Sequence, residues 1–213
     1  GASATVSIGC SRTFAGGSAS TPAMRADATR AYFGDNDGRL IALDSSCGQA
    51  WSLDVGGQIV GAIAVSSDNH ELYAATQTAI VKVVDEGDHG EVAWHADLDA
   101  YVPAEGDQTS YNLLLASIGA NGIGVSIGAG LPPGTLADVA LPVAVGYGVL
   151  DRETGELRSF ADGLEESIAE MNIGPDGAYY SPNSPLRRAF ARVLDPSARP
   201  LEGGIRKFAP QNE

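Results

Sequence analysis

One unit recurs along this chain, and its period constrains the fold more than any other feature. Each copy runs from an Asp through a Gly to an aromatic residue, and the copies begin at Asp44, Asp85, Asp151 and Asp195. Consecutive copies begin 41 (44 to 85), 66 (85 to 151) and 44 (151 to 195) residues apart. A period of about 40 residues made of short apolar runs is typical of a unit of four antiparallel strands. The middle spacing exceeds its neighbours by about 25 residues, which predicts an insertion in one unit.

Each unit divides into short runs that predict β-strands. The runs are rich in Val, Ile, Tyr and Ala and are bounded by Gly, Asn, Asp or Pro, as strands joined by turns are. The first unit gives Ser20–Ala26, Arg30–Gly34, Arg39–Asp44 and Gln49–Asp54, and the last gives Ser167–Ile173, Ala178–Ser181, Arg187–Asp195 and Gly204–Ala209. Since no segment keeps a helical period, we predict an all-β fold, a β-propeller with four four-stranded blades. The expected blades cover residues 18–55, 58–98, 110–161 and 165–209.

The aromatic residue at the end of each unit has an expected structural role. The inner strand of a blade lies near a crowded axis, where small residues such as those of 61–65 fit and large rings do not. We therefore expect the ring that ends each unit to pack between adjacent blades rather than to stack on a ligand. These residues are Trp51, Trp94, Phe160 and Phe208.

Two segments resemble the PQQ-type repeat of quinoprotein-like β-propellers. They are Gly38-Arg-Leu-Ile-Ala-Leu-Asp44, followed by Gly48 and Trp51, and Val149-Leu-Asp-Arg-Glu-Thr-Gly155. The resemblance covers most of residues 20–209. It implies one of two functions, because the family includes alcohol and glucose dehydrogenases that hold PQQ and Ca²⁺, and also scaffold propellers of the bacterial envelope that bind no cofactor. The vicinal cysteine pair that caps the cofactor in many quinoprotein dehydrogenases is absent from this sequence.

Residues 4–14 repeat the end of a unit without its beginning. The spacing from Gly9 to Phe14 equals the spacing from Gly155 to Phe160, so we interpret this segment as the outer strand of a preceding, fifth blade. An open arc of blades leaves an apolar face exposed, which monomers avoid. The families that this chain resembles close rings of seven or eight blades, so we expect it to be part of such a ring, completed by another segment or a companion chain. A compact four-bladed ring with a spare N-terminal strand is the alternative.

The charge excludes some classes of partner. With 27 acidic and 13 basic residues the formal net charge is −14. Binding to nucleic acid needs clustered Lys and Arg, and an anionic membrane surface also attracts basic segments, so we expect neither partner. No apolar run in the sequence approaches the roughly 18 residues of a membrane-spanning helix. An acidic, lysine-poor chain with this resemblance is expected in the periplasm or outside the cell.

The two cysteines, Cys10 and Cys47, fall beside equivalent turns of consecutive units. Equivalent turns of adjacent blades lie on the same face, so a disulfide between these residues is geometrically possible. An oxidising compartment would favour the bridge, although a count of two cysteines leaves free thiols open as the alternative.

Metal-binding and catalytic patterns are weak in this sequence. Asp35 and Asp37 place oxygen ligands at alternate positions, as hard-cation loops do, but a tight turn between two strands is the favoured interpretation. The three histidines, His70, His89 and His95, have no metal-ligand spacing with a cysteine. We therefore predict no catalytic residues and no metal or cofactor, with PQQ and calcium as the alternative.

The longest loops point to a binding surface. They are residues 99–110, before the third blade, and residues 129–141, between its second and third strands. In an antiparallel blade these two connections lie on the same face, and long loops on a rigid scaffold commonly carry function. The residues we expect at this ligand or partner rim are Tyr101, Glu105, Asp107, Tyr111, Leu131, Pro132 and Pro133. The alternative is that the two loops only pack on each other or on another part of the ring.

Two functions follow from these patterns. The favoured one is a non-catalytic binding or scaffolding propeller of the bacterial envelope or exterior, with a protein partner or a companion chain that completes the ring. The alternative is part of a PQQ-dependent quinoprotein dehydrogenase.

Overall fold

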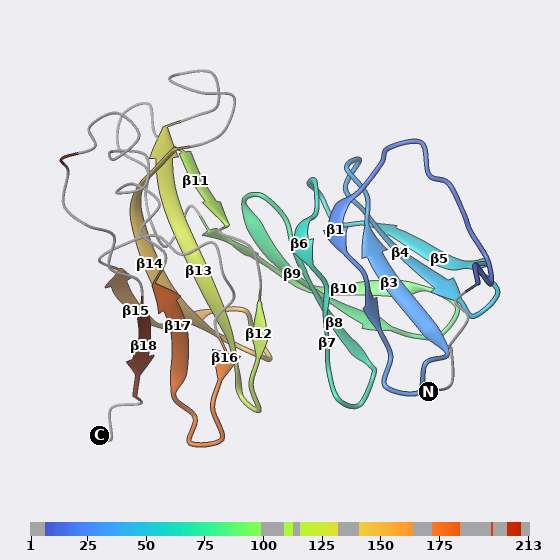
Figure 1. The fold of residues 1–213 in the computed structure, drawn as a ribbon. Helices are drawn as coiled ribbons and strands as arrows, with labels where there is room; N and C mark the ends of the chain where they lie inside the picture. Colours follow the sequence, from blue (N-terminus) through green and yellow to red (C-terminus); the bar gives the residue numbers. More distant parts are fainter. Residues whose placement is uncertain are drawn as a thin grey trace, which may run out of the picture.

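The computed structural model describes residues 7–98, 109–112, 116–131, 141–163, 172–183, 197 and 204–209. The elements formed by these residues are β-strands, as the sequence predicts (Figure 1). Among the described residues there is no helix of the length and apolarity needed to cross a membrane.

The first two sheets are four-stranded and antiparallel, and in each of them every strand pairs with the next one along the chain. Blade 1 consists of β2 (Ala23–Met24), β3 (Arg30–Gly34), β4 (Arg39–Asp44) and β5 (Gln49–Asp54). Blade 2 consists of β7 (Ala64–Val65), β8 (Glu71–Ala75), β9 (Ala79–Asp85) and β10 (Gly90–Asp97). The three expected strands that follow the inner strand of blade 1 coincide with β3, β4 and β5 residue for residue.

The third sheet is the longest because its central hairpin is extended. Blade 3 consists of β11 (Thr109–Asn112), β12 (Ser117–Ile118), β13 (Gly122–Leu131), β14 (Leu141–Asp151) and β15 (Leu157–Gly163). Both β11 and β12 pair with β13. The predicted insertion therefore lengthens the strands of this blade as well as its loops.

The fourth sheet differs from the predicted strand order. Blade 4 contains β16 (Asn172–Ile173), β17 (Tyr179–Asn183) and β18 (Gly204–Phe208). We expected β18 as the fourth strand, but it pairs directly with β17 and so occupies the third position. The expected third strand, Arg187–Asp195, lies outside the described residues. Twenty residues separate β17 from β18, and over a connection of that length the local sequence does not say which strand the chain will pair with when it returns to the sheet.

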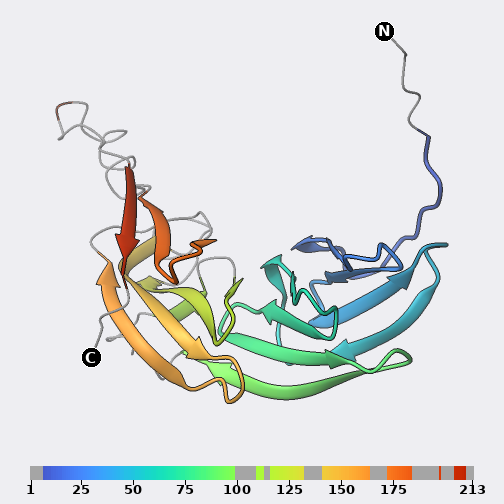
Figure 2. The ribbon, with the colours of Figure 1, turned by 90° about the horizontal axis from the view of Figure 1, so that it is seen from below.

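The blades form an open arc with the inner strands on its concave side (Figure 2). On that side β1 (Ala19–Thr21) and β6 (Val60–Ala62), which begin the inner edges of blades 1 and 2, pair in parallel. Ser20 lies opposite Gly61 in this ladder, and such small residues allow two backbones to approach closely. The inner strands of adjacent blades thus join each other as well as their own sheets.

The hydrophobic core lies between the blades rather than within one sheet. One cluster joins Tyr32, Leu40 and Trp51 of blade 1 to Leu72 and Val83 of blade 2. A second cluster joins Tyr73 and Ile80 of blade 2 to Ile123, Val125 and Leu150 of blade 3. Blades 1, 2 and 3 are therefore stabilised largely by their neighbours, as in repeat folds whose units cannot bury their own faces alone.

The recurring Gly and aromatic residue meet across the blade boundary. A Cβ at Gly90 would lie 3.0 Å from the Trp51 ring, and a Cβ at Gly155 would lie 2.8 Å from the Trp94 ring. The aromatic residue that ends one unit thus packs on the turn glycine of the next unit. This contact accounts for both residues of the repeat at the junctions of blades 1 and 2 and of blades 2 and 3.

The two phenylalanines also pack between blades, but toward the preceding blade. Phe160 covers Gly146 and joins the cluster shared by blades 2 and 3. The Phe208 ring lies with its centre 5.1 Å from that of Tyr147 in blade 3. The expected interblade packing is confirmed for all four aromatic residues, although its direction changes after the second blade.

We expect Gly155→Ala to lower the free energy of unfolding by about 2–3 kcal/mol, because it combines a strained backbone with overpacking against Trp94. Gly177→Ala is the matched control: both glycines have a φ of 74°, but a Cβ at Gly177 would meet nothing within 4 Å. The control should therefore cost only the backbone strain, about 1 kcal/mol. Chemical denaturation of both variants measures the difference, and equal losses would show that the contact with Trp94 does not matter.

Candidate functional site

The described ends of the two rim loops pair with each other in blade 3. Thr109 lies opposite Gly130, and Ser110 lies opposite Ala129, in the β11–β13 ladder. The predicted loop boundaries were therefore wrong at these ends, because residues 109–110, 129–131 and 141 belong to strands. The ladder brings both loop ends to the same end of blade 3 (Figure 1).

The structure describes only part of the predicted rim. Tyr111 lies in β11 and Leu131 is the last residue of β13. The other rim residues, Tyr101, Glu105, Asp107, Pro132 and Pro133, lie outside the described residues. Whether the seven residues form one binding surface stays a prediction.

A row of side-chain amides lies on the corresponding loops of blades 1 and 2. The Gln77 Nε2 donates to the Gln58 Oε1 at 3.1 Å, and the Gln58 Nε2 donates to the Asn36 Oδ1 at 3.1 Å. Asn36 and Gln77 follow the second strand of their blades, and Gln58 follows the last strand of blade 1. By strand order these connections share a face with the rim loops, so the face continues as a polar surface of amides that also carries the Asp37–Arg39 ion pair.

The weak metal candidates form a turn. Asp35 is fully buried, and its Oδ1 accepts from the backbone N–H groups of Asp37 and Arg39 at 3.0 and 2.8 Å. Its Oδ2 accepts from the Arg39 Nε at 2.7 Å, and the Arg39 guanidinium also lies 3.3 Å from the Asp37 Oδ2. The favoured interpretation, a tight turn between β3 and β4, is confirmed. Among the described residues no group of three or more acidic, His or Cys side chains is placed to hold a metal.

The possible disulfide is confirmed. Cys10 and Cys47 are bonded, with their Cα atoms 6.0 Å apart. The bond ties the N-terminal segment to the turn between β4 and β5. The same segment also contacts blade 1 through the Phe14 ring, whose centre is 4.7 Å from that of Phe33, and through the Arg12 guanidinium, which donates to the Gln49 Oε1 at 3.3 Å. Residues 7–18 themselves form no strand.

A buried carboxylate connects blades 1 and 2. The Asp85 side chain, which has no exposed surface, accepts hydrogen bonds from Arg30 at 2.8 and 2.9 Å, from the Trp51 indole at 3.0 Å and from the Tyr32 hydroxyl. Burial alone would raise the pKa of Asp85, but hydrogen bonds from Tyr32, Gly87, Trp51 and Arg30 outweigh burial and hold the pKa below its ordinary value. Burial and the adjacent carboxylate raise the pKa of the Tyr32 hydroxyl.

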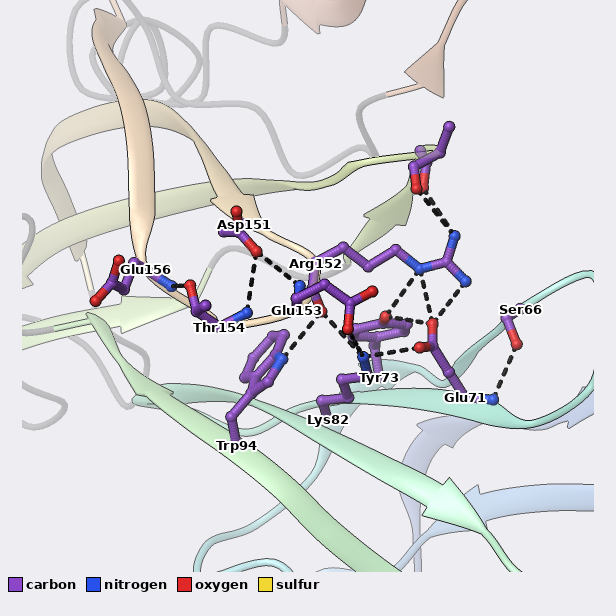
Figure 3. Close-up of polar contacts among 12 residues, drawn as sticks. Ser66, Glu71, Tyr73, Lys82, Trp94, Asp151, Arg152, Glu153, Thr154 and Glu156 are labelled. Atoms are coloured by element: carbon purple, nitrogen blue, oxygen red, sulfur yellow. Dashed lines mark hydrogen bonds and ion pairs between the residues drawn. The ribbon is translucent and has the colours of Figure 1, made fainter.

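A second charged cluster connects blades 2 and 3 (Figure 3). The Glu71 carboxylate accepts from the Lys82 Nζ at 2.7 Å, the Arg152 guanidinium at 2.6 Å and the Tyr73 hydroxyl at 2.8 Å. Arg152 also donates to the backbone oxygens of Gly119 and Ala120, at 3.3 Å each. Burial would raise the pKa of Glu71, but the hydrogen bonds from Lys82, Tyr73 and Arg152 hold it below its ordinary value.

The carbonyl oxygen of Arg152 completes the junction. It accepts from the Trp94 indole and from the Lys82 Nζ, each at 3.1 Å. Neither cluster was predicted from the sequence, although a signal was present: Tyr32 and Tyr73 hold equivalent places in β3 and β8, one residue type repeated in the same position of two units. Their carboxylate partners are on different strands, which local spacing does not reveal.

Comparison with known proteins supports the propeller fold. No family model and no curated protein matches the chain. Among solved structures it is similar to U3-55K (TM-score 0.54, 9% identity, covering 81% of this chain and 47% of that one). It is also similar to the β-propeller domain of Cps50 (Swd1) from Myceliophteria thermophila (TM-score 0.53, 14% identity, 76% and 46%). A third is the quinohemoprotein alcohol dehydrogenase from Comamonas testosteroni (TM-score 0.50, 14% identity, 71% and 22%).

These likenesses establish the fold alone: the chain is an all-β propeller structure. It spans less than half the length of each of these structures. The resemblance to a propeller is thus confirmed, whereas the PQQ-type repeat itself has no matching family model.

Proposed function

We propose that this chain is a non-catalytic binding or scaffolding propeller segment of the bacterial envelope or exterior, and that it meets a protein partner at the rim of blade 3. The observation that carries the proposal is the extended β11–β13–β14 ladder, because the described ends of both rim loops meet at one end of it. Loops on a rigid support lose less entropy on binding. The propeller fold of the similar structures is consistent with a scaffolding role, but it does not identify the partner.

The buried charges of the described blades support the same proposal. Asp85 holds Arg30 and Tyr32 of the neighbouring blade, Glu71 holds Arg152 of the neighbouring blade and Tyr73 of its own strand, and Asp35 holds Arg39. These carboxylates are engaged in structural contacts, so they stabilise the arc rather than act as free acids or bases. The Cys10–Cys47 disulfide is consistent with an oxidising compartment outside the cytoplasm.

Deleting residues 131–137 should leave the fold intact and abolish capture of the partner. Affinity purification from the source organism's envelope fraction, with the intact chain and the deletion variant side by side, measures partner binding. Circular dichroism and the midpoint of thermal unfolding check the fold. Substitution of the exposed Asp88 by asparagine is the control, because it lies on the opposite face. Equal recovery of the partner by the deletion variant would place the binding surface elsewhere.

The second candidate is part of a PQQ-dependent dehydrogenase. It is kept because of the likeness to the quinohemoprotein alcohol dehydrogenase. The experiment adds PQQ and Ca²⁺ and follows dye-linked oxidation of alcohols and sugars. We expect no turnover, and activity that depends on both additions would overturn the scaffold proposal.

A further inference from the structure

The two ends of the arc carry complementary surfaces. On blade 1, cross-strand pairing places Met24 beside Ala31 and Ala31 beside Leu43. These residues and Phe33 lie on the opposite side of the sheet from Tyr32 and Ala42, which pack on blade 2. The outer side of blade 1 is therefore an apolar sheet face: Phe14 of the N-terminal segment packs on Phe33 there, and Met24 on the same face is 61% exposed. Such a face is what a further blade would cover.

The other end of the arc has an exposed face and an available strand edge. Phe208 packs on blade 3, so Ile205 and Lys207, which alternate with it along β18, face away from that blade. Ile205 is 76% exposed, and the Lys207 Nζ lies over the Tyr180 ring at 5.5 Å from its centre. In the described part of blade 4, β18 pairs on one side only, with β17. Among the described strands of this blade, the outer edge of β18 is therefore open to a fourth strand.

The N-terminal segment supplies a strand in the right place. Residues 7–14 form no strand among the described residues, yet the disulfide and Phe14 hold them beside blade 1, on its outer side. Ile8 in this segment is 87% exposed. A segment immediately before blade 1 occupies the position of the outer strand of a preceding blade.

We propose that the partner at these ends is a second copy of this chain, and that two arcs close one eight-bladed ring with two-fold symmetry. In this ring, residues 7–14 of each copy form the fourth strand of the other copy's blade 4. The apolar face of blade 1 packs on the Ile205 face. One chain carries both halves of the joint, so a two-fold axis satisfies both ends at once. Three of the four large hydrophobic residues most exposed in the described chain, Ile8, Met24 and Ile205, lie at this joint.

Analytical ultracentrifugation at physiological salt tests the proposal. We expect a particle of twice the 21.8 kDa chain mass. Ile205→Asp and Met24→Asp should each raise the dimer dissociation constant roughly tenfold or more, since each places a charge in a buried apolar joint. Val92→Asp is the matched control, because Val92 is also exposed (40%) but lies on the outer strand of blade 2. Circular dichroism confirms that each variant is folded.

Hydrogen exchange distinguishes strand exchange from other association. Dimer formation should slow exchange at backbone amides of residues 8–14 and 204–208, and Ile8→Asp, in a segment without regular structure, should reverse this without disturbing the blades. A monomer at all concentrations, or a dimer whose mass all three variants leave unchanged, would overturn the proposal. The dimer proposal shares only the propeller fold with the proposed scaffold role. If deletion of residues 131–137 abolishes partner capture but leaves the dimer mass unchanged, the result concerns the rim of blade 3 and not the joint between the two copies.

Discussion

Asp85→Ala is expected to lower the free energy of unfolding by about 3–5 kcal/mol, the range for removing one member of a buried, hydrogen-bonded charge pair. The carboxylate is completely buried between blades 1 and 2, where it accepts from Arg30, Trp51 and Tyr32. Without it the Arg30 guanidinium loses its ion pair while remaining mostly buried, and three further donors, the Trp51 indole, the Tyr32 hydroxyl and the Gly87 N–H, lose their acceptor. The loss of unfolding free energy should therefore be several times larger than that caused by an ordinary surface substitution.

Urea denaturation followed by tryptophan fluorescence measures this loss, because Trp51 donates directly to Asp85. Asp88→Ala is the control: its side chain is 91% exposed and only three residues away, so it should change stability by less than about 0.5 kcal/mol. If Asp85→Ala costs no more than Asp88→Ala, the carboxylate does not hold the two blades together.

The repeat made the architecture predictable because it reports strand length and turn chemistry, which are local properties. The run Arg39–Asp44 ends in an Asp whose carboxylate accepts from the N–H of Gly48 at 2.8 Å, so sequence alone locates both the strand and its turn. The same logic made a Cys10–Cys47 disulfide geometrically possible, since equivalent turns of adjacent units lie on one face, but two cysteines alone left free thiols open until the structure showed the bond. Local rules that agree with the global fold are the ones that sequence analysis detects.

Features that depend on long connections could not be predicted in the same way. The position of β18 next to β17 depends on a connection of twenty residues, and such a connection allows more than one strand order. The Asp85 and Glu71 clusters join residues that are 55 and 81 positions apart (30 to 85 and 71 to 152). Nothing in the spacing of Glu71 from Arg152 signals contact, because the inserted residues of blade 3 lie between them.

Glu71→Gln is expected to lower the free energy of unfolding at neutral pH by about 3 kcal/mol. Glu71 is the shared acceptor of Lys82 and Arg152. The Lys82 side chain is only 6% exposed, so neutral glutamine would leave this cation with Glu153, whose carboxylate lies 3.8 Å away and is 81% exposed, as its compensating charge. It would also remove the carboxylate that Arg152, itself 20% exposed, pairs with in this cluster. Glu153→Gln is the matched control within the same cluster, and we expect it to cost less than about 0.5 kcal/mol because its charge is screened by solvent.

The pH dependence separates the charge of Glu71 from its shape. The folded structure holds the pKa of Glu71 below the ordinary value of 4.5, so the unfolded chain binds more protons at this site between the two values. The stabilisation by Glu71 is therefore fully present above pH 4.5 and is lost as the pH falls through the lower, folded value. A protonated glutamic acid resembles glutamine, so the difference in stability between the native chain and Glu71→Gln should be largest near pH 7 and shrink below pH 4.5. Denaturation curves at intervals between pH 7 and pH 3 measure that difference. A gap that stays constant over this range would mean that packing, rather than the charge of Glu71, joins blade 2 to blade 3.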